Sequence, residues 1–249
     1  MIIGIILAAG KGTRLKSKDK NKVTLPFLNK PLIVYSVELF QAVCEKVVVV
    51  IGAFHESVRQ VLENYRVIYA YQKKRLGTAH AVKIGLEAIK NTTPLPDLVL
   101  VGYGDHTMFY KKETIKKLIE IHRKNNPAIS LLTFEHPCPN KIKYGRIIRD
   151  RLGQVVDIVE QKDATQEQLK IKEVNPGFYC FNYQFLLKNI NRVKKSSASG
   201  EYYLTDMVEI AVWQGKKVIG LPIKFEDAGL GVNTAEELAE SEKIYLRKK

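Results

Sequence analysis

The sequence predicts an α/β fold with a mixed, mostly parallel central sheet flanked by helices. In the first half, continuously apolar and β-branched stretches such as residues 2–7 and 46–51 alternate with longer amphipathic ones. Strands buried on both faces have such continuous apolar runs, and their alternation with helices implies right-handed parallel crossovers. After about residue 127, strand-like stretches follow one another with few helices between them, which indicates a mixed or antiparallel extension of the same sheet.

The first half supplies alternating strands and helices. The expected strands are apolar, and they cover residues 2–7, 46–51, 67–71 and 97–101. The expected helices place apolar residues on one face, and they cover residues 31–43, 55–64, 77–90 and 111–125. Pro31 is expected at the first position of its helix, where the N–H that proline lacks would be unpaired in any case.

The second half is expected to extend the sheet and to close with a helix. Its expected strands are residues 128–134, 145–149, 154–160, 177–182 and 217–222. Its expected helices are residues 203–213 and a last helix that runs from Thr234 towards Tyr245. Thr234 and Glu237 form the Ser/Thr-x-x-Glu capping-box pattern, which is typical of a helix start.

Composition limits the classes of protein to consider. With 249 residues, 45% of them hydrophobic, the chain can bury the core of one large α/β domain or two small ones. Cys44, Cys138 and Cys180 are widely spaced, which favours a reducing compartment and gives no metal-ligand pair. The apolar start lacks a basic flank and no stretch reaches transmembrane length, so we expect a cytoplasmic protein with no membrane partner.

The formal net charge of +14 favours anionic partners in general. The basic residues form short, scattered clusters, and the sequence shows no aromatic-interleaved basic stripe and no signature of a nucleic-acid module. A solvated lysine-rich surface and a small anionic substrate are therefore favoured over a specific nucleic-acid partner.

The loop after the first expected strand is rich in glycine and cations. In "GIILAAGKGTRLK" the apolar run ends at Ala9, and Gly10, Lys11 and Gly12 follow. Glycines let backbone N–H groups approach a phosphate at the carboxyl edge of a parallel sheet, and cations neutralise it. The P-loop pattern is not met, and Leu15 stands where the dinucleotide pattern needs its third glycine. The loop thus predicts a nucleotide site of another kind.

The stretch "LAAGKGTRL" (residues 7–15), followed by Lys22 in "NKVTLP", resembles the sugar-phosphate nucleotidyltransferases. Within them, "QKKRLGTAHAV" (72–82) resembles the uracil-side segment of the bacterial N-acetylglucosamine-1-phosphate uridylyltransferases. Further stretches that resemble this group are "YGD" (103–105), "YGRIIRD" (144–150), "IVEQKDAT" (158–165), "EVNPG" (173–177), "GEYYLTD" (200–206) and "GVNT" (231–234). One such motif would be weak, but a series in the same order from residue 7 to residue 234 is specific.

The resemblance implies a Rossmann-like nucleotidyltransferase fold of the GT-A-like kind. It implies a single domain over residues 1–249, with a nucleotide-binding half of about 1–127 and a sugar-binding half of about 128–249. The implied reaction transfers UMP from UTP to N-acetylglucosamine 1-phosphate, giving UDP-N-acetylglucosamine and pyrophosphate with Mg²⁺ as cofactor. Because the attacking phosphate is already ionised, such catalysis depends on positioning and charge neutralisation and needs no strong general base.

The resemblance also assigns roles to residues. It implies that Arg14 and Lys22 are catalytic, holding the triphosphate, and that Asp105 and Asn233 ligate Mg²⁺. The residues implied to bind the nucleotide are Leu7, Ala8, Ala9, Gly10, Gly12, Thr13, Gln72, Gly77 and Thr78. The residues implied to bind the sugar are Tyr103, Gly145, Glu160, Asn175 and Tyr203.

The sequence departs from the family pattern at several positions. Asn21 replaces the proline that usually precedes the lysine, and Ala79 replaces a glycine. Nearer the sugar side, "GDHTM" (104–108) replaces Gly-Asp-x-Pro-Leu, and Pro176 replaces a threonine. We expect no C-terminal left-handed β-helix with acetyltransferase activity. A homo-oligomer stays open, but the trimer that such a domain forms is not implied.

Alternative functions stay open at this point. The same chemistry would suit glucose 1-phosphate as the acceptor, or dTTP in place of UTP. A non-catalytic regulatory subunit of the same fold is a reading from another class, and the joint presence of Arg14, Lys22, Asp105 and Asn233 argues against it. A nucleic-acid binder is the weakest alternative, and it would show steeply salt-dependent binding.

Overall fold

The computed structural model describes residues 1–12 and 20–248 of the chain. The elements of its first half are β1 (Ile2–Ala8), β2 (Pro26–Phe27), β3 (Lys30–Pro31), α1 (Leu32–Gln41), β4 (Lys46–Ile51), α2 (His55–Val61), β5 (Ile68–Tyr71), α3 (Thr78–Ile89), β6 (Leu98–Tyr103) and α4 (Lys112–Asn125). A short 3-10 helix at Lys22–Thr24 lies between β1 and β2. The predicted alternation of strands and helices is therefore present.

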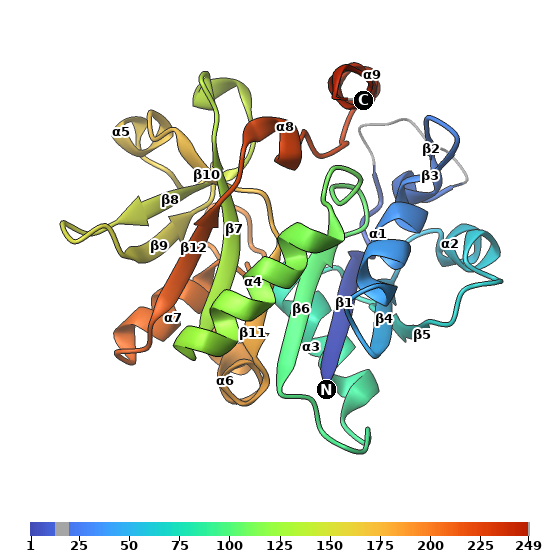
Figure 1. Ribbon diagram of the computed structural model, residues 1–249, viewed down its shortest axis with the longest axis horizontal. Coiled ribbons are helices and arrows are strands. Elements are labelled where there is room, and N and C mark those ends of the chain that lie inside the picture. Colours follow the sequence, from blue (N-terminus) through green and yellow to red (C-terminus); the bar gives the residue numbers. More distant parts are fainter. Residues whose placement is uncertain (13–19, 249) are drawn as a thin grey trace.

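The second half begins at β7. Its elements are β7 (Ile129–Glu135), β8 (Gly145–Arg149), β9 (Val155–Val159), α5 (Gln166–Leu169), β10 (Glu173–Asn175), β11 (Tyr179–Asn182), α6 (Tyr183–Asn189), α7 (Asp206–Trp213), β12 (Val218–Pro222), α8 (Phe225–Ala228) and α9 (Ala235–Arg247). Strands dominate up to β11 (Figure 1), as the sequence predicted.

One sheet runs through both halves. Ten strands belong to it in the described residues, in the order β5-β4-β1-β6-β11-β7-β10-β8-β9, with β12 beside β7. The pairs among β5, β4, β1 and β6 are parallel, with Ile5 opposite Val48 on one side and Val101 on the other. From β11 onwards the pairs are antiparallel except that of β7 with β12. The predicted mixed sheet flanked by helices is confirmed.

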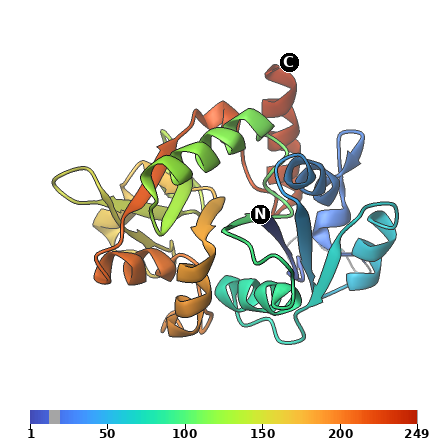
Figure 2. The same cartoon turned by 60° about the horizontal axis from the view of Figure 1, so that its bottom comes forward.

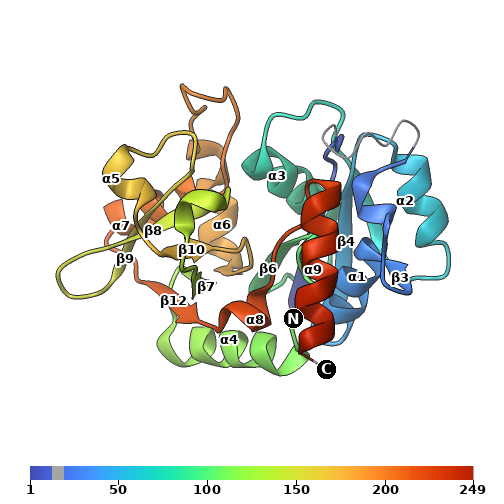
Figure 3. The same cartoon turned by 90° about the horizontal axis from the view of Figure 1, so that it is seen from above.

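Two apolar clusters cover opposite faces of the sheet, and β1 contributes to both. Ile3 and Ile5 pack in the cluster that includes buried residues of α3, α6 and α7. Ile2 and Ile6 pack in the cluster that includes buried residues of α1, α2 and α4. Alternate strand residues face opposite ways, so a strand buried on both faces must be apolar throughout. The two helical layers are seen on either side of the sheet in Figures 2 and 3.

The starts of three helices test the sequence predictions in detail. The expectation for Pro31 is wrong by one residue, because Pro31 pairs with Pro26 in the β2–β3 ladder and is the extended N-cap of α1. The helix expected over 203–213 begins only at Asp206. The capping box of Thr234 and Glu237 is confirmed at α9, with both reciprocal hydrogen bonds present. Side-chain capping is local chemistry, which is why it could be predicted.

The C-terminal segment returns to the N-terminal half. Val232 donates its N–H to the Asp105 carbonyl at 3.1 Å, just after β6. A third apolar cluster joins Val232 to Phe27 and Phe109, and the rings of Phe27 and Tyr245 meet edge to face at 5.4 Å. In Figure 3, α9 lies in the foreground, with β6 to its left and β4 to its right. Residues 231–234 are thereby brought to the strand ends of the first half.

None of the helices described here is long and apolar enough to cross a membrane.

Candidate active site

Two adjoining cavities lie where the strands of the parallel set end. The larger has a volume of about 520 Å³ and the smaller a volume of about 230 Å³. Lys22, Tyr103 and Asp105 line both, so the two cavities meet at these residues. Open parallel sheets bind ligands outside the carboxyl ends of their strands, and this is therefore the candidate site.

The larger cavity gathers most of the residues assigned to the nucleotide. The sequence-predicted residues that line it are Leu7, Ala8, Ala9, Gly10, Gln72, Gly77 and Thr78. Gly12 is not among its lining residues. It has a φ of +61°, and a Cβ there would lie 2.8 Å from the Cβ of Lys22, so glycine is required where the loop passes Lys22. Thr13 and Arg14 lie outside the described residues.

The orientation of Gln72 is set by a histidine. Gln72 is buried at the end of β5, and its Nε2 donates to the Gly77 carbonyl at 3.2 Å and to His80 Nδ1 at 2.8 Å. Burial lowers the pKa of His80, so its ring is neutral near pH 7 and can accept this hydrogen bond. The amide of Gln72 is therefore held in one orientation beside the cavity.

The start of α3 is fixed by a segment more than a hundred residues away. Tyr202 donates its N–H to the Leu76 carbonyl and accepts from Ala79, and Leu204 donates to Thr78 Oγ1 at 2.8 Å. Gly77 has a φ of +109°, and a Cβ there would lie 2.4 Å from the Tyr202 carbonyl oxygen. Only glycine fits this close approach. The same docking puts Glu201 on the wall of the larger cavity.

The smaller cavity is lined by most of the residues assigned to the sugar. These are Tyr103, Gly145, Glu160 and Asn175, from the ends of four strands. Tyr203 is not among the described residues that line either cavity. It lies in the turn before α7, next to the segment that docks on α3.

Asn175 uses its amide within the protein. Its Nδ2 donates to Tyr179 Oη at 2.6 Å, and its Oδ1 accepts from the Gly177 N–H at 3.0 Å. Gly177 has a φ of +84° and lies against the ring of Tyr103. Asn175 therefore shapes the turn that forms the cavity wall.

Glu160 brings a carboxylate to the smaller cavity, directly after β9. Thr205 Oγ1 donates to its Oε1 at 3.1 Å. Burial raises the pKa of this carboxyl above its usual value, although the hydrogen bond from Thr205 lowers it. A desolvated carboxylate of this kind can accept hydrogen bonds from sugar hydroxyls, which would replace the lost solvation.

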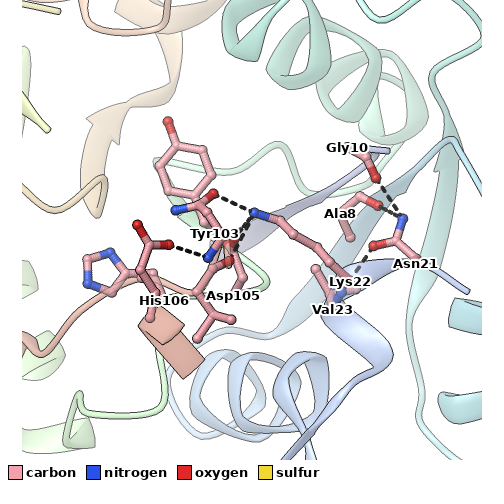
Figure 4. A network of polar contacts seen from close by, with 12 residues as sticks. Ala8, Gly10, Asn21, Lys22, Val23, Tyr103, Asp105 and His106 are labelled. Carbon is pink, nitrogen blue, oxygen red and sulfur yellow. Dashed lines mark hydrogen bonds and ion pairs between the residues drawn. The ribbon is translucent and has the colours of Figure 1, made fainter. Parts of the chain in front are cut away.

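Lys22, Asp105 and Asn233 lie where the two cavities meet, and we call this place the seam. The ammonium group of Lys22 occupies it. Lys22 forms an ion pair with Asp105 Oδ2, and its Nζ donates to Asn233 Oδ1 at 2.9 Å and to the Val232 carbonyl at 3.2 Å. Figure 4 shows Lys22 reaching from the 3-10 helix towards Asp105. Residues from two other, distant parts of the sequence thus contact the one positive charge of Lys22.

His106 and Tyr144 lie beside this seam and line the smaller cavity. Burial lowers the pKa of His106, whose Nδ1 lies 2.8 Å from the Pro176 carbonyl oxygen. Its Nε2 lies 3.3 Å from both the Gly229 carbonyl oxygen and Tyr144 Oη, and Tyr144 Oη accepts from the Gly231 N–H at 2.6 Å. The two rings stack with centroids 5.3 Å apart. This chain connects Asp105 to the segment that carries Asn233.

Sequence reasoning did not assign roles to Asn21, His106 or Tyr144. The sequence did single out Asn21 as a departure from the family pattern, because a proline usually stands at this position. No pattern along the chain could reveal the hydrogen bonds of His106 and Tyr144, because their partners lie 70 and 87 residues away.

The chain matches the family described as nucleotidyl transferase over residues 3–230. It is 43% identical over 238 residues to the bifunctional protein GlmU of Caldicellulosiruptor saccharolyticus, which covers 94% of this chain and 50% of that protein. It is 40% identical over 241 residues to the bifunctional protein GlmU of Clostridium kluyveri, which covers 96% of this chain and 51% of that protein. The chain therefore spans about half the length of these relatives.

The fold is similar to that of a UDP-glucose pyrophosphorylase solved with UDP-glucose. The TM-score is 0.77 at 22% identity, and the alignment covers 100% of both chains. At this identity the likeness concerns the fold alone. The family match and the curated relatives, together with this fold, show that the chain belongs to the nucleotidyl transferase family.

Proposed function

We propose that this chain transfers UMP from UTP to N-acetylglucosamine 1-phosphate, forming UDP-N-acetylglucosamine and pyrophosphate with Mg²⁺. The observation that carries the proposal is the seam of Lys22, Asp105 and Asn233 between the two cavities. One cavity is lined by the glycine loop and the other by a buried carboxylate, as a nucleotide and a sugar would need. The motifs and the relatives named GlmU support the same reaction.

The oxygens at the seam suit a cation. Asp105 is 9% exposed, and its carboxylate, the Asn233 amide oxygen and the Val232 carbonyl all contact the Lys22 ammonium. No three of the His, Cys, Asp and Glu side chains in residues 1–12 and 20–248 cluster as a metal site, so the metal proposal rests on Asp105 and Asn233. Mg²⁺ takes few protein ligands beside phosphate oxygens and water, and when bound it would neutralise phosphate charge.

The residues of the chain would align the two substrates. An oxygen of the sugar phosphate attacks the α-phosphorus of UTP, the bond from that phosphorus to the β-phosphate oxygen breaks, and pyrophosphate leaves. The backbone of Ala9 and Gly10 would cradle the phosphates. A Cβ at Gly10 would meet no atom of the described residues within 4 Å, which leaves room for a ligand. Lys22 and Arg14 would stabilise the charge that builds on pyrophosphate.

The nucleotide would bind in the larger cavity and the sugar phosphate in the smaller one. Gln72, fixed by His80, would read the polar edge of uracil, and Glu160 would accept hydrogen bonds from sugar hydroxyls. Lys22 would exchange its contacts with Asp105 and Asn233 for contacts with phosphate. Chemistry would thus take place where the cavities meet.

The test is pyrophosphate release from the purified protein with UTP, Mg²⁺ and N-acetylglucosamine 1-phosphate. Glucosamine 1-phosphate and glucose 1-phosphate serve as competing acceptors, and dTTP as a competing donor. We expect preference for the acetylated sugar and for UTP. The Asp105→Ala variant should lose about 10²–10³-fold or more in kcat/KM, since one group that stabilises transition-state charge is worth about that much.

The other outcomes are equally informative. Release with another sugar or nucleotide would keep the chemistry and overturn the substrate. No release with any pair, from folded protein, would favour the non-catalytic regulatory subunit. Full activity of Asp105→Ala would exclude the proposed seam as the reaction centre.

A further inference from the structure

Asn21 is fully buried beside the larger cavity, with an exposed fraction of 0%. Its side-chain nitrogen faces three backbone carbonyls, those of Ala8 at 3.0 Å, Gly10 at 3.1 Å and Ala53 at 2.7 Å. Figure 4 shows this amide against the turn that follows β1. Two of the three carbonyls belong to the loop that lines the larger cavity.

The other polar groups of Asn21 hold the turn that carries Lys22. Its Oδ1 accepts from the Val23 N–H at 3.1 Å, which caps the 3-10 helix at Lys22–Thr24. Its carbonyl accepts from the Thr24 N–H and from Thr24 Oγ1. Its N–H donates to Ser57 Oγ at 3.0 Å, which anchors it to α2.

One side chain therefore fastens two parts of the candidate site to each other. Buried carbonyls without a donor cost about 1–3 kcal/mol each, so removal of the amide would force the loop at Ala8 and Gly10 to move or to admit water. The same removal would leave the Val23 N–H unpaired and release the turn of Lys22. Both parts would contact one ligand if the proposed function is right, and their relative position then decides how well the triphosphate is held.

We propose that Asn21 is a positioning residue that sets the glycine loop at Ala8 and Gly10 in register with Lys22 for nucleoside triphosphate binding. The proposal rests on the proposed function of the site. It assigns Asn21 to the nucleotide alone, because within residues 1–12 and 20–248 its hydrogen bonds reach no residue that lines only the smaller cavity.

The backbone of Asn21 adds a way to test this. Its φ of −69° and ψ of 140° are values that proline adopts. A proline would restore the restraint on the turn of Lys22, but it would lack both the amide and the N–H that Ser57 accepts. Asn21→Ala removes the amide without this restraint, so the two variants separate the backbone from the side chain.

The experiment compares UTP binding with sugar phosphate use. UTP affinity is measured by calorimetry without acceptor, KM for each substrate by pyrophosphate release, and stability by thermal unfolding. The matched control is Asn189→Ala in α6, because Asn189 is also buried, at 5% exposed, and its amide is also hydrogen-bonded at both ends, to Phe185 and Gln214.

For Asn21→Ala we expect UTP affinity to fall about tenfold or more, with KM for the sugar 1-phosphate within about twofold of wild type. Asn189→Ala should lose stability and keep UTP affinity. Asn21→Pro should recover part of the lost affinity. Should Asn21→Ala fail to fold, Ser57→Ala, which removes one bond to Asn21, should show a smaller loss of UTP affinity alone.

The proposal is overturned if Asn21→Ala, or Ser57→Ala in its place, binds UTP as tightly as Asn189→Ala does. Equal changes in both KM values would also overturn it, because they would show a general loss of structure. Failure of the proposed function looks different. Wild-type protein would then fail to bind UTP, and the same comparison would be made with the nucleoside triphosphate that it does bind; binding of none would end both proposals.

Discussion

The two cavities are built in different ways. The larger cavity takes most of its lining from two short stretches, residues 7–11 at the end of β1 and just beyond it, and residues 72–78 directly after β5. The smaller takes its lining from the ends of β6, β8, β9 and β10 and from residues 231–233. The lining of the larger cavity therefore follows mainly from where β1 and β5 end. The lining of the smaller cavity depends on segments that are distant in the sequence and meet only in the folded protein.

The interactions that hold the two walls differ accordingly. On the nucleotide side, backbone hydrogen bonds between neighbouring strands and between Tyr202, Leu76 and Ala79 fix the wall. On the sugar side, side chains such as His106 and Tyr144 connect one segment to the next. We therefore expect substitutions at closely packed glycines, and at the buried Asn21, to damage the larger cavity, and changes of lining side chains such as Glu160 to affect the smaller cavity.

The largest effect is expected for Gly77→Ala on the nucleotide side. The new Cβ would lie 2.4 Å from the Tyr202 carbonyl at a φ of +109°, so strain and displacement should lower the free energy of unfolding by about 2–4 kcal/mol. Denaturant unfolding measures this. The control is Gly153→Ala, where φ is +75° but no atom of residues 1–12 and 20–248 would lie within 4 Å of the new Cβ, and only about 1–2 kcal/mol should be lost. Equal losses would mean that the contact with Tyr202 does not fix this wall.

A smaller effect, confined to the sugar side, is expected for Glu160→Gln. The substitution keeps the shape and removes the charge, so KM for the sugar 1-phosphate should rise about 10–100-fold. KM for UTP should stay within about twofold, because Glu160 lines only the smaller cavity. Steady-state kinetics with each substrate varied in turn measure both values. The control is the exposed Glu209→Gln in α7, and a parallel rise in both KM values would contradict the division between the cavities.

The smallest effect is expected for Asp206→Asn at the start of α7. Burial and then the charge of Glu209 raise the pKa of Asp206 from 3.8 to about 7. Between about pH 4 and pH 7 the folded protein therefore holds a proton that the unfolded chain has lost, so this group makes stability fall as pH rises through that window.

Asp206→Asn should remove this fall and raise the melting temperature near pH 8 by no more than about 2–4 °C, since solvent screens a half-buried group. Its effect at pH 4 should be close to zero, because Asp206 is then protonated in the folded protein. Thermal unfolding at both pH values measures the difference. A gain that is equal at both pH values would mean that the buried charge of Asp206 is not its cause.

Much of the fold could be predicted from the sequence. The apolar run of β1, the alternation of strands and helices, the mixed second half and the capping box of α9 all follow from patterns along the chain. The resemblance also named Lys22, Asp105 and Asn233, which the structure brings together, although their roles stay proposals. For Tyr203, which is not among the described residues that line either cavity, the assignment to the sugar stays a prediction.

The sequence by itself determined the main apolar strands, the alternation of strands and helices in the first half and the cap of α9, because hydrophobic patterning and helix capping act between neighbours in the chain. Only the tertiary structure decided that the Asn21 amide joins the glycine loop to Lys22, and that His106 reaches Pro176. It also decided that burial raises the pKa of Glu160. The physical reason is that burial and long-range hydrogen bonds depend on which segments pack together, and no local pattern specifies that packing.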